Sequence, residues 1–197
     1  MIAGIITGGL EVSESNKRIC PVESAGGLDN GLRRWLQNPQ KLLGPYVTEG
    51  MTVLDVGCGP GFFSVEMARM VGKSGRVIAS DLQEGMLQIV KGKIMGTELA
   101  ERILLHKCGE KNIGVSEPVD FVLLFYMVHE VPDKEHLFSE IRTILKQDGQ
   151  VLIVEPPFHV SRPAFEETVR IAGDAGFVVA ERPRILFSKA VLLRTAR

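Results

Sequence analysis

Three glycines and an acidic residue alternate with other residues in the stretch DVGCGPG, directly after a short apolar run. Asp55, Gly57, Gly59 and Gly61 form the pattern D-x-G-x-G-x-G. Because glycine allows tight turns and a close approach of the backbone to a ligand, the pattern predicts a loop that holds a nucleoside-containing cofactor. Two classes fit such a loop: a nicotinamide or flavin dinucleotide, and S-adenosylmethionine.

The sixth position of the loop separates these two classes. Dinucleotide-binding loops follow G-x-G-x-x-G, in which the last small residue lets the helix pack closely on the strand. Counted from Gly57, the sixth position here is Phe62. A phenylalanine would crowd that packing, so the dinucleotide class is disfavoured.

A second set of reactive residues lies in LLFYMVHEVPD, residues 123–133, where Glu130 and Asp133 stand close to His129 in sequence. Histidine exchanges its proton near neutral pH and therefore suits a general base. The alternative is that His129 caps or buttresses the loop before the next helix, and the sequence leaves both interpretations open. Glu155, which ends another apolar run, could face a substrate.

Alternating apolar runs and amphipathic segments must position these residues. The strand segments are TVLDVG, GRVIASD, RILLHKC, VDFVLLFYMV and GQVLIVEP, with two more in FVVAERPRILFSKAVLLRTA. The helical segments between the first five imply parallel strands joined by right-handed crossovers. We therefore predict a doubly wound α/β fold with a mostly parallel, seven-stranded sheet and an antiparallel terminal strand.

The ends of the predicted strands indicate where a ligand binds. In an open α/β sheet, ligands bind beyond the carboxyl ends of the strands. Asp81 closes the second strand, 20 residues after Gly61. A carboxylate at that point can accept the protons of both ribose hydroxyls. The alternative is that Asp81 caps the helix that follows, which is a common role.

Composition limits the partners and the compartment. The chain has 197 residues, a formal net charge of −1 and three cysteines without metal-ligand spacing. This charge gives no reason to expect nucleic acid as a partner, and no metal site is predicted. Reduced cysteines fit a cytoplasmic protein. No apolar run approaches the length of a membrane span, so no membrane partner is predicted.

The stretch VLDVGCGPG resembles the first motif of class I S-adenosylmethionine-dependent methyltransferases. The similarity continues through the order of strands and helices to residue 196, and it implies the Rossmann-like fold of that family. Residues 123–133 are similar to the segment after strand four in the small-molecule branch, which includes methylases of quinone precursors. The resemblance implies transfer of a methyl group from S-adenosylmethionine to an unidentified small-molecule acceptor, with S-adenosylhomocysteine as the product.

The resemblance also implies roles for individual residues. Asp55 is expected to hold the positively charged amino-acid end of the cofactor and Asp81 the ribose, while His129 is the candidate catalytic base. Phe125 and Tyr126 are expected beside the methylthio group. The complete set of expected cofactor-binding residues is Asp55, Gly57, Cys58, Gly59, Gly61, Asp81, Leu82, Cys108, Gly109, Phe125 and Tyr126.

The adenine position departs from the family pattern. Relatives usually carry an Asp followed by a small residue after the third strand, where this chain has Cys108 and Gly109. A cysteine is a poor hydrogen-bond acceptor. Backbone groups or Glu110 are therefore the expected substitutes.

Two parts of the chain are expected to have separate roles. Residues 1–45 are expected to form an N-terminal arm and lid helices, and residues 46–197 the cofactor-binding methyltransferase domain. Within the arm, Leu28 to Leu36 has helical spacing and includes Trp35. This segment could close over the cofactor or pack as an outer helix. A homodimer or an accessory subunit could also cover the site.

Other functions fit these residues less well. The leading alternative is a domain that binds the cofactor without catalysis and acts as a partner or sensor, because a fold alone does not establish activity. Methylation of trivalent arsenic needs several converging thiolates, whereas the three cysteines are scattered. A nicotinamide oxidoreductase is disfavoured by Phe62.

Overall fold

A seven-stranded sheet forms the centre of the computed structural model, which describes residues 38–196. The strands are β1 (Thr52–Val56), β2 (Arg76–Asp81), β3 (Ile103–Lys107), β4 (Val119–Phe125), β5 (Leu145–Glu155), β6 (Phe177–Glu181) and β7 (Lys189–Thr195). The helices are α3 (Pro39–Leu43), α4 (Phe62–Met70), α5 (Glu84–Ile94), α6 (Lys134–Ile144) and α7 (Arg162–Asp174), with 3₁₀ turns η3 (Glu98–Glu101) and η4 (Val128–Glu130).

The strands follow the order β3-β2-β1-β4-β5-β7-β6 across the sheet. All pairings among β1 to β5 are parallel. β7, the last strand of the sequence, pairs antiparallel with both β5 and β6 and lies between them. The predicted fold class, a mostly parallel doubly wound sheet with an antiparallel terminal strand, is therefore confirmed.

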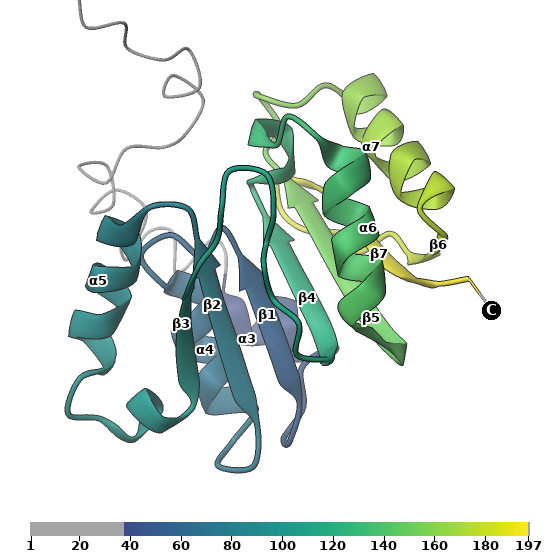
Figure 1. Cartoon of the computed structure of the whole chain (residues 1–197). Helices are drawn as coiled ribbons and strands as arrows, with labels where there is room; N and C mark the ends of the chain where they lie inside the picture. Colours follow the sequence, from purple (N-terminus) through teal and green to yellow (C-terminus); the bar gives the residue numbers. More distant parts are fainter. Residues whose placement is uncertain (1–37, 197) are drawn as a thin grey trace, which may run out of the picture.

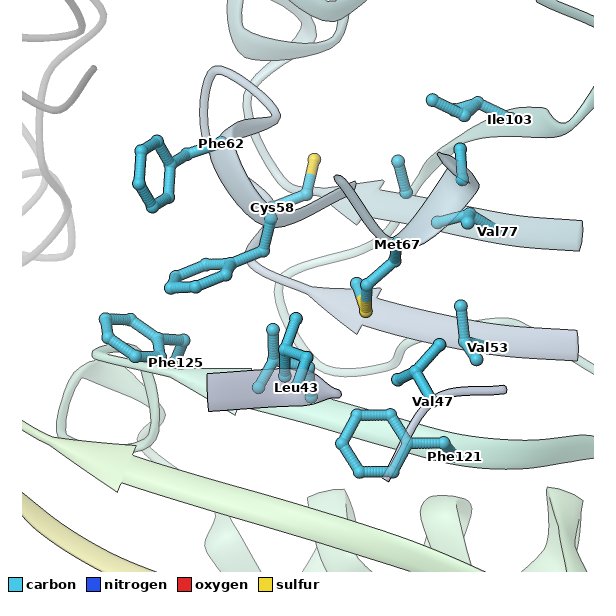
Figure 2. Packing of buried hydrophobic residues seen from close by; sticks show 14 of the residues in the cluster. Leu43, Val47, Val53, Cys58, Phe62, Met67, Val77, Ile103, Phe121 and Phe125 are labelled. Carbon is cyan, nitrogen blue, oxygen red and sulfur yellow. The ribbon is translucent and has the colours of Figure 1, made fainter. Parts of the chain in front are cut away.

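Helices cover both faces of this sheet (Figure 1). α3, α4 and α5 pack on one face, and Figure 2 shows Met67 of α4 and Phe121 of β4 among the buried side chains of that layer. α6 and α7 pack on the other face, around Phe138 and Ile153. Because β4 is covered on both sides, its sequence VDFVLLF is almost continuously apolar.

Parallel register brings the ends of four strands to one edge of the sheet. Val56 at the end of β1 lies opposite Ser80 of β2 and Leu124 of β4. Phe125 at the end of β4 lies opposite Val154 of β5. The segments that follow these strands therefore emerge side by side, at the edge where ligands of such sheets bind.

The short helix α3 belongs to the packed core. Its Leu43 is fully buried, although it falls within residues 1–45, for which an arm and a lid were predicted. The predicted lid, Leu28 to Leu36, lies outside the described residues, so the division at residue 45 stays a prediction. Within the described part of the chain, no helix combines the length and apolar character that crossing a membrane requires.

Candidate functional site

The loop after β1 adopts backbone conformations that favour glycine. Gly57, Gly59 and Gly61 have φ values of 69°, 53° and 80°. A Cβ on Gly61 would lie 2.8 Å from Cγ2 of Val90 in α5, whereas a Cβ on Gly59 would meet no atom within 4 Å. Gly61 is therefore required for the packing of α5 against the loop, while Gly59 leaves open space beside the backbone.

Phe62 starts α4 and turns into the core. It is 6% exposed and packs edge-on against Phe63, with ring centroids 4.9 Å apart. Phe62 thus occupies the position at which the dinucleotide pattern has its last small residue, and the tight contact of the neighbouring Gly61 is with Val90 of α5. The loop therefore differs in three dimensions, as it does in sequence, from a dinucleotide-binding loop.

Asp55 lies inside β1 and is 2% exposed. Its Oδ2 accepts a hydrogen bond of 2.5 Å from Ser64 Oγ, in the first turn of α4. The carboxylate thus joins the strand before the glycine loop to the helix after it. Its expected contact with the amino-acid end of the cofactor stays a prediction.

Asp81 ties the end of β2 to the glycine loop. Its Oδ2 accepts a hydrogen bond from Gly59 N and its Oδ1 accepts one from Gln83 N, both at 2.8 Å. The N-cap of α5 is Gln83, so helix capping does not account for Asp81. Burial raises the pKa of Asp81, although the backbone hydrogen bonds act in the opposite direction. A carboxylate offers about four acceptor sites, so capacity remains for ribose hydroxyls.

Cys58 and Leu82 lie at the same edge, next to the two acidic strand residues. Cys58 N donates to Ser80 O at 3.0 Å, and burial raises the pKa of the Cys58 thiol. Figure 2 shows Cys58 on the loop after β1, and its side chain belongs to the buried cluster on this face of the sheet. The Cys58 thiol is therefore neutral and acts as a small apolar group. Leu82, which follows Asp81, is partly exposed.

The segment after β3 provides few donors for an adenine ring. Cys108 N donates to Asp81 O at 3.1 Å, and Gly109 N donates to Asn112 O at 3.0 Å. Burial raises the pKa of the Cys108 thiol, which keeps it protonated. The backbone N–H groups of Cys108 and Gly109 are therefore already hydrogen-bonded within the protein. If the backbone binds the adenine, as expected, it does so through carbonyl oxygens, and the alternative is the exposed side chain of Glu110.

Phe125 and Tyr126 mark the point where the chain leaves β4. Phe125 packs on Phe63 and on Tyr126, in each case with ring centroids 4.3 Å apart. Tyr126 has a φ of 59°, which is uncommon for a residue with a side chain, and its hydroxyl lies 2.6 Å from Ser188 Oγ. Backbone strain of this kind clusters at functional sites. The contact with Ser188 links the end of β4 to the turn before β7.

His129 stands in η4, shortly after β4, and contacts Glu155 at the end of β5. Its backbone N donates to Oε1 of Glu155 at 2.9 Å, and its Nδ1 lies 2.7 Å from Oε2. Glu155 is 1% exposed, whereas the side chain of His129 is 27% exposed. A carboxylate that accepts from Nδ1–H leaves Nε2 of the neutral imidazole as the basic nitrogen. The pair can therefore take a proton from a neighbouring molecule.

Charges around His129 favour its protonated form. The hydrogen bond from Nδ1 to Glu155 raises the pKa of His129, and this effect outweighs the lowering by burial. Glu130 contributes in the same direction, and burial raises its own pKa. The charge of Asp81 also raises the pKa of Glu130. His129 and Asp81, the candidate for ribose binding, both lie close enough to Glu130 to shift its pKa.

Glu155 is the residue whose role the sequence did not reveal. The expectation that it faces a substrate is wrong, because its side chain is buried against His129. Asp133 has a structural role as well, since it caps α6 by accepting a hydrogen bond from His136 N at 2.8 Å. A signal for Glu155 was present in the sequence, since an acidic residue directly after the apolar run VLIV must find a partner when it is buried.

Comparisons with known proteins place this chain among methyltransferase-like sequences. Residues 53–149 match the family model described as a methyltransferase domain. A demethylmenaquinone methyltransferase of Lactobacillus johnsonii is 32% identical over 130 residues, which cover 66% of this chain and 51% of that protein. One of Bacillus cereus is 28% identical over 123 residues, covering 62% of this chain and 51% of that protein. The chain thus spans about half the length of these curated relatives.

Solved structures share the fold. A SAM-dependent methyltransferase from Aquifex aeolicus matches with a TM-score of 0.77 at 27% identity, covering 88% of this chain and 98% of that one. Fibrillarin from Aeropyrum pernix, solved with bound S-adenosyl-L-methionine, matches with a TM-score of 0.64 at 13% identity, covering 79% of this chain and 73% of that one. At this low identity, the match shows only that the two proteins share a fold. The loop motif, the sheet order and these matches together show that residues 53–149 form a methyltransferase domain, and that the chain is similar to class I S-adenosylmethionine-dependent methyltransferases, the demethylmenaquinone methyltransferases among them.

Proposed function

We propose that this chain transfers the methyl group of S-adenosylmethionine to a small-molecule acceptor, with His129 as the general base and Glu155 as its positioning residue. The observation that carries this proposal is the pairing of both Glu155 oxygens with His129, at the sheet edge that also holds the glycine loop. A bidentate, buried partner of this kind fixes the orientation and the proton position of one imidazole.

The residues present fit the cofactor. Gly59 leaves open space where a nucleoside needs close backbone approach, and Asp81 retains acceptor capacity for a ribose. Asp55 supplies negative charge behind the loop for the amino-acid end. When bound, S-adenosylmethionine supplies a methyl group on a sulfonium sulfur that is open to in-line displacement.

The remaining chemistry belongs to side chains of this chain. His129 Nε2 takes the proton that the acceptor atom loses, and Glu155 holds the imidazolium that results. Phe125 is 7% exposed and packs with Tyr126, so these rings exclude water beside the reacting atoms. Alignment of the acceptor supplies the larger part of the acceleration.

The acceptor is a molecule whose attacking atom carries a dissociable proton. The curated relatives are named for demethylmenaquinone, so a quinone-like aromatic ring is the first acceptor to test. The chain carries a net charge of −1, which offers no general attraction for nucleic acid. We place the reaction in the cytoplasm, and we expect the segment from Leu28 to Leu36, a second copy of the chain or an accessory subunit to cover the site.

A labelled-methyl assay tests this function. The full chain is incubated with methyl-labelled S-adenosylmethionine and separate pools of small metabolites, including quinone precursors, and of proteins. Label is expected in the small-molecule pool with wild type, and at a strongly reduced rate with His129→Gln. Tight cofactor binding without transfer into any pool would instead support a non-catalytic sensor. Label in the protein pool alone would contradict the acceptor class.

A further inference from the structure

Three large apolar side chains are exposed on two loops at the ligand edge of the sheet. Phe158 in the loop after β5 is 93% exposed, and Leu186 and Phe187 in the turn before β7 are 54% and 70% exposed. No other phenylalanine within residues 38–196 is exposed to this degree. We call these three residues the apolar rim.

The two loops of the apolar rim are joined to each other and to the site. Lys189 Nζ donates to Pro157 O at 3.2 Å, and Lys189 lies opposite Glu155 in the pairing of β5 with β7. Ser188 Oγ lies 2.6 Å from the hydroxyl of Tyr126. The rim therefore lies beside the proposed acceptor site, on a framework held by hydrogen bonds.

The turn holds Phe187 in a strained conformation without burying it. Phe187 has a φ of 53°, in the left-handed region that residues with a side chain rarely adopt. Ser188 N donates to Ile185 O at 3.0 Å, and Ser188 Oγ donates to Leu186 O at 3.2 Å, which fixes the turn. Strain maintained around an exposed aromatic ring has no packing benefit within the described chain, and such strain is typical of functional positions.

Basic residues outnumber acidic ones in the two loop segments that carry the apolar rim. The segments 156–162 and 181–189 contain four arginine or lysine residues and one glutamate, although the whole chain carries a net charge of −1. Arg182 is paired with Glu166. Arg162 and Arg184 are exposed, and no ion pair among the described residues holds either of them. Exposed aromatic and aliphatic side chains flanked by exposed cations fit the interface of an anionic lipid bilayer.

We propose that the apolar rim docks this protein on the surface of an anionic membrane, with Phe158 and Phe187 inserted among the headgroups. This departs from the sequence-based prediction of no membrane partner, which considered spans and not surface contacts. Docking here places the proposed acceptor site at the bilayer surface, where apolar acceptors concentrate. Lipid binding requires neither cofactor nor methyl transfer, so its failure would leave the proposed function standing.

Vesicle sedimentation with the full chain tests the proposal. Wild type is expected to bind vesicles of phosphatidylcholine with phosphatidylglycerol, more weakly at high salt, and to bind poorly to phosphatidylcholine alone. In the double variant Phe158→Ser with Phe187→Asn, affinity is expected to fall by about tenfold or more for each phenylalanine lost. Because asparagine tolerates positive φ, the substitution Phe187→Asn should not lower the unfolding temperature of the variant.

Met95→Ser is the matched control. Met95 is 72% exposed and follows α5, which packs near β3. β3 is the first strand in the order across the sheet, whereas the apolar rim lies by β5 and β7 near the other end of that order. Vesicle binding should be unchanged in this variant. The proposal is overturned if wild type does not bind anionic vesicles, if the rim variant binds like wild type, or if the control loses as much. It is also overturned if sedimentation velocity without lipid shows a dimer that the rim variant abolishes, because a second copy would then cover the rim.

Discussion

Glu155 accepts two hydrogen bonds from the single residue His129, one from the backbone N at 2.9 Å and one from Nδ1 at 2.7 Å. The two residues are 26 positions apart and come from the ends of neighbouring parallel strands. One carboxylate therefore fixes both the backbone of η4 and the ring that η4 carries. A carboxylate on Nδ1 fixes the tautomer in which Nε2 is basic, as the proposed general base requires, while the backbone hydrogen bond buttresses η4.

Removal of the base should reduce turnover without affecting the cofactor. In His129→Gln, kcat is expected to fall by about 10²–10⁴, the usual contribution of general base catalysis. The dissociation constant of S-adenosylhomocysteine, measured by calorimetry, should stay the same, because the glycine loop and Asp81 bind this molecule and His129 does not. His136→Gln, which changes an exposed histidine on α6, is the matched control. An unchanged kcat in His129→Gln would assign the residue a structural role.

The pH profile should report the contact between His129 and Glu155. Because Glu155 raises the pKa of His129, the acid limb of kcat/KM should lie above the ordinary range of histidine. Glu155→Gln removes this charge, so the limb is expected to move to lower pH. A limb that does not move would show that His129 is not the titrating group.

Stability should change with pH in the opposite sense to activity. The pKa of His129 is higher in the folded state, so its contribution to stability is complete below the ordinary histidine pKa and is lost as pH rises through the raised value. Thermal unfolding of wild type and Glu155→Gln across this range measures the difference.

Substitution of Asp81 should weaken both the cofactor and the fold. Asp81→Ala is expected to weaken S-adenosylhomocysteine binding by about 1–3 kcal/mol, the scale of hydrogen bonds to a charged group. Asp81 is 7% exposed and accepts from Gly59 and Gln83, so the variant should also lose about 1–3 kcal/mol of unfolding free energy.

A control for Asp81 is available on the surface. Asp174→Asn alters an exposed carboxylate whose ion pair with Arg170 contributes little. Denaturant titration and calorimetry should both leave this variant close to wild type. Folded Asp81→Ala that binds S-adenosylhomocysteine with unchanged affinity would exclude the ribose contact.

The glycine loop offers a matched pair of substitutions. Gly59 and Gly96 both have positive φ, 53° and 76°, and a Cβ on either would meet no atom within 4 Å. Gly59→Ala and Gly96→Ala should therefore each cost about 1–2 kcal/mol of stability from backbone strain. Cofactor affinity should fall in Gly59→Ala alone, as measured by calorimetry. Equal affinities in the two variants would mean that the cofactor does not approach Gly59.

The sequence predicted the elements whose signal is local. The run VLDV followed by glycines specified a strand, a turn and a helix, and α4 ends before Gly72, whose φ is 66°. The continuous apolar segment of β4 specified a strand covered on both faces. These features depend on neighbouring residues, so composition and spacing were sufficient to identify them.

Contacts between distant segments were beyond the sequence. The partner of His129 is Glu155, and their contact follows from the register of β4 with β5, which no local pattern encodes. Tight packing falls on Gly61 because Val90 of α5 lies against it. The exposure of Phe158 has the same origin, since an aromatic residue is expected in the core until the fold shows that nothing described covers it.

The central claim is that the glycine loop and Asp81 bind the S-adenosyl nucleoside. Isothermal titration calorimetry of the full chain with S-adenosylhomocysteine and with NAD, in parallel, tests it most directly. The open space at Gly59 and the remaining acceptor capacity of Asp81 predict saturable binding of S-adenosylhomocysteine, and Phe62 at the sixth position of the loop predicts no binding of NAD. Tight binding of NAD, with no heat from S-adenosylhomocysteine, would contradict the account.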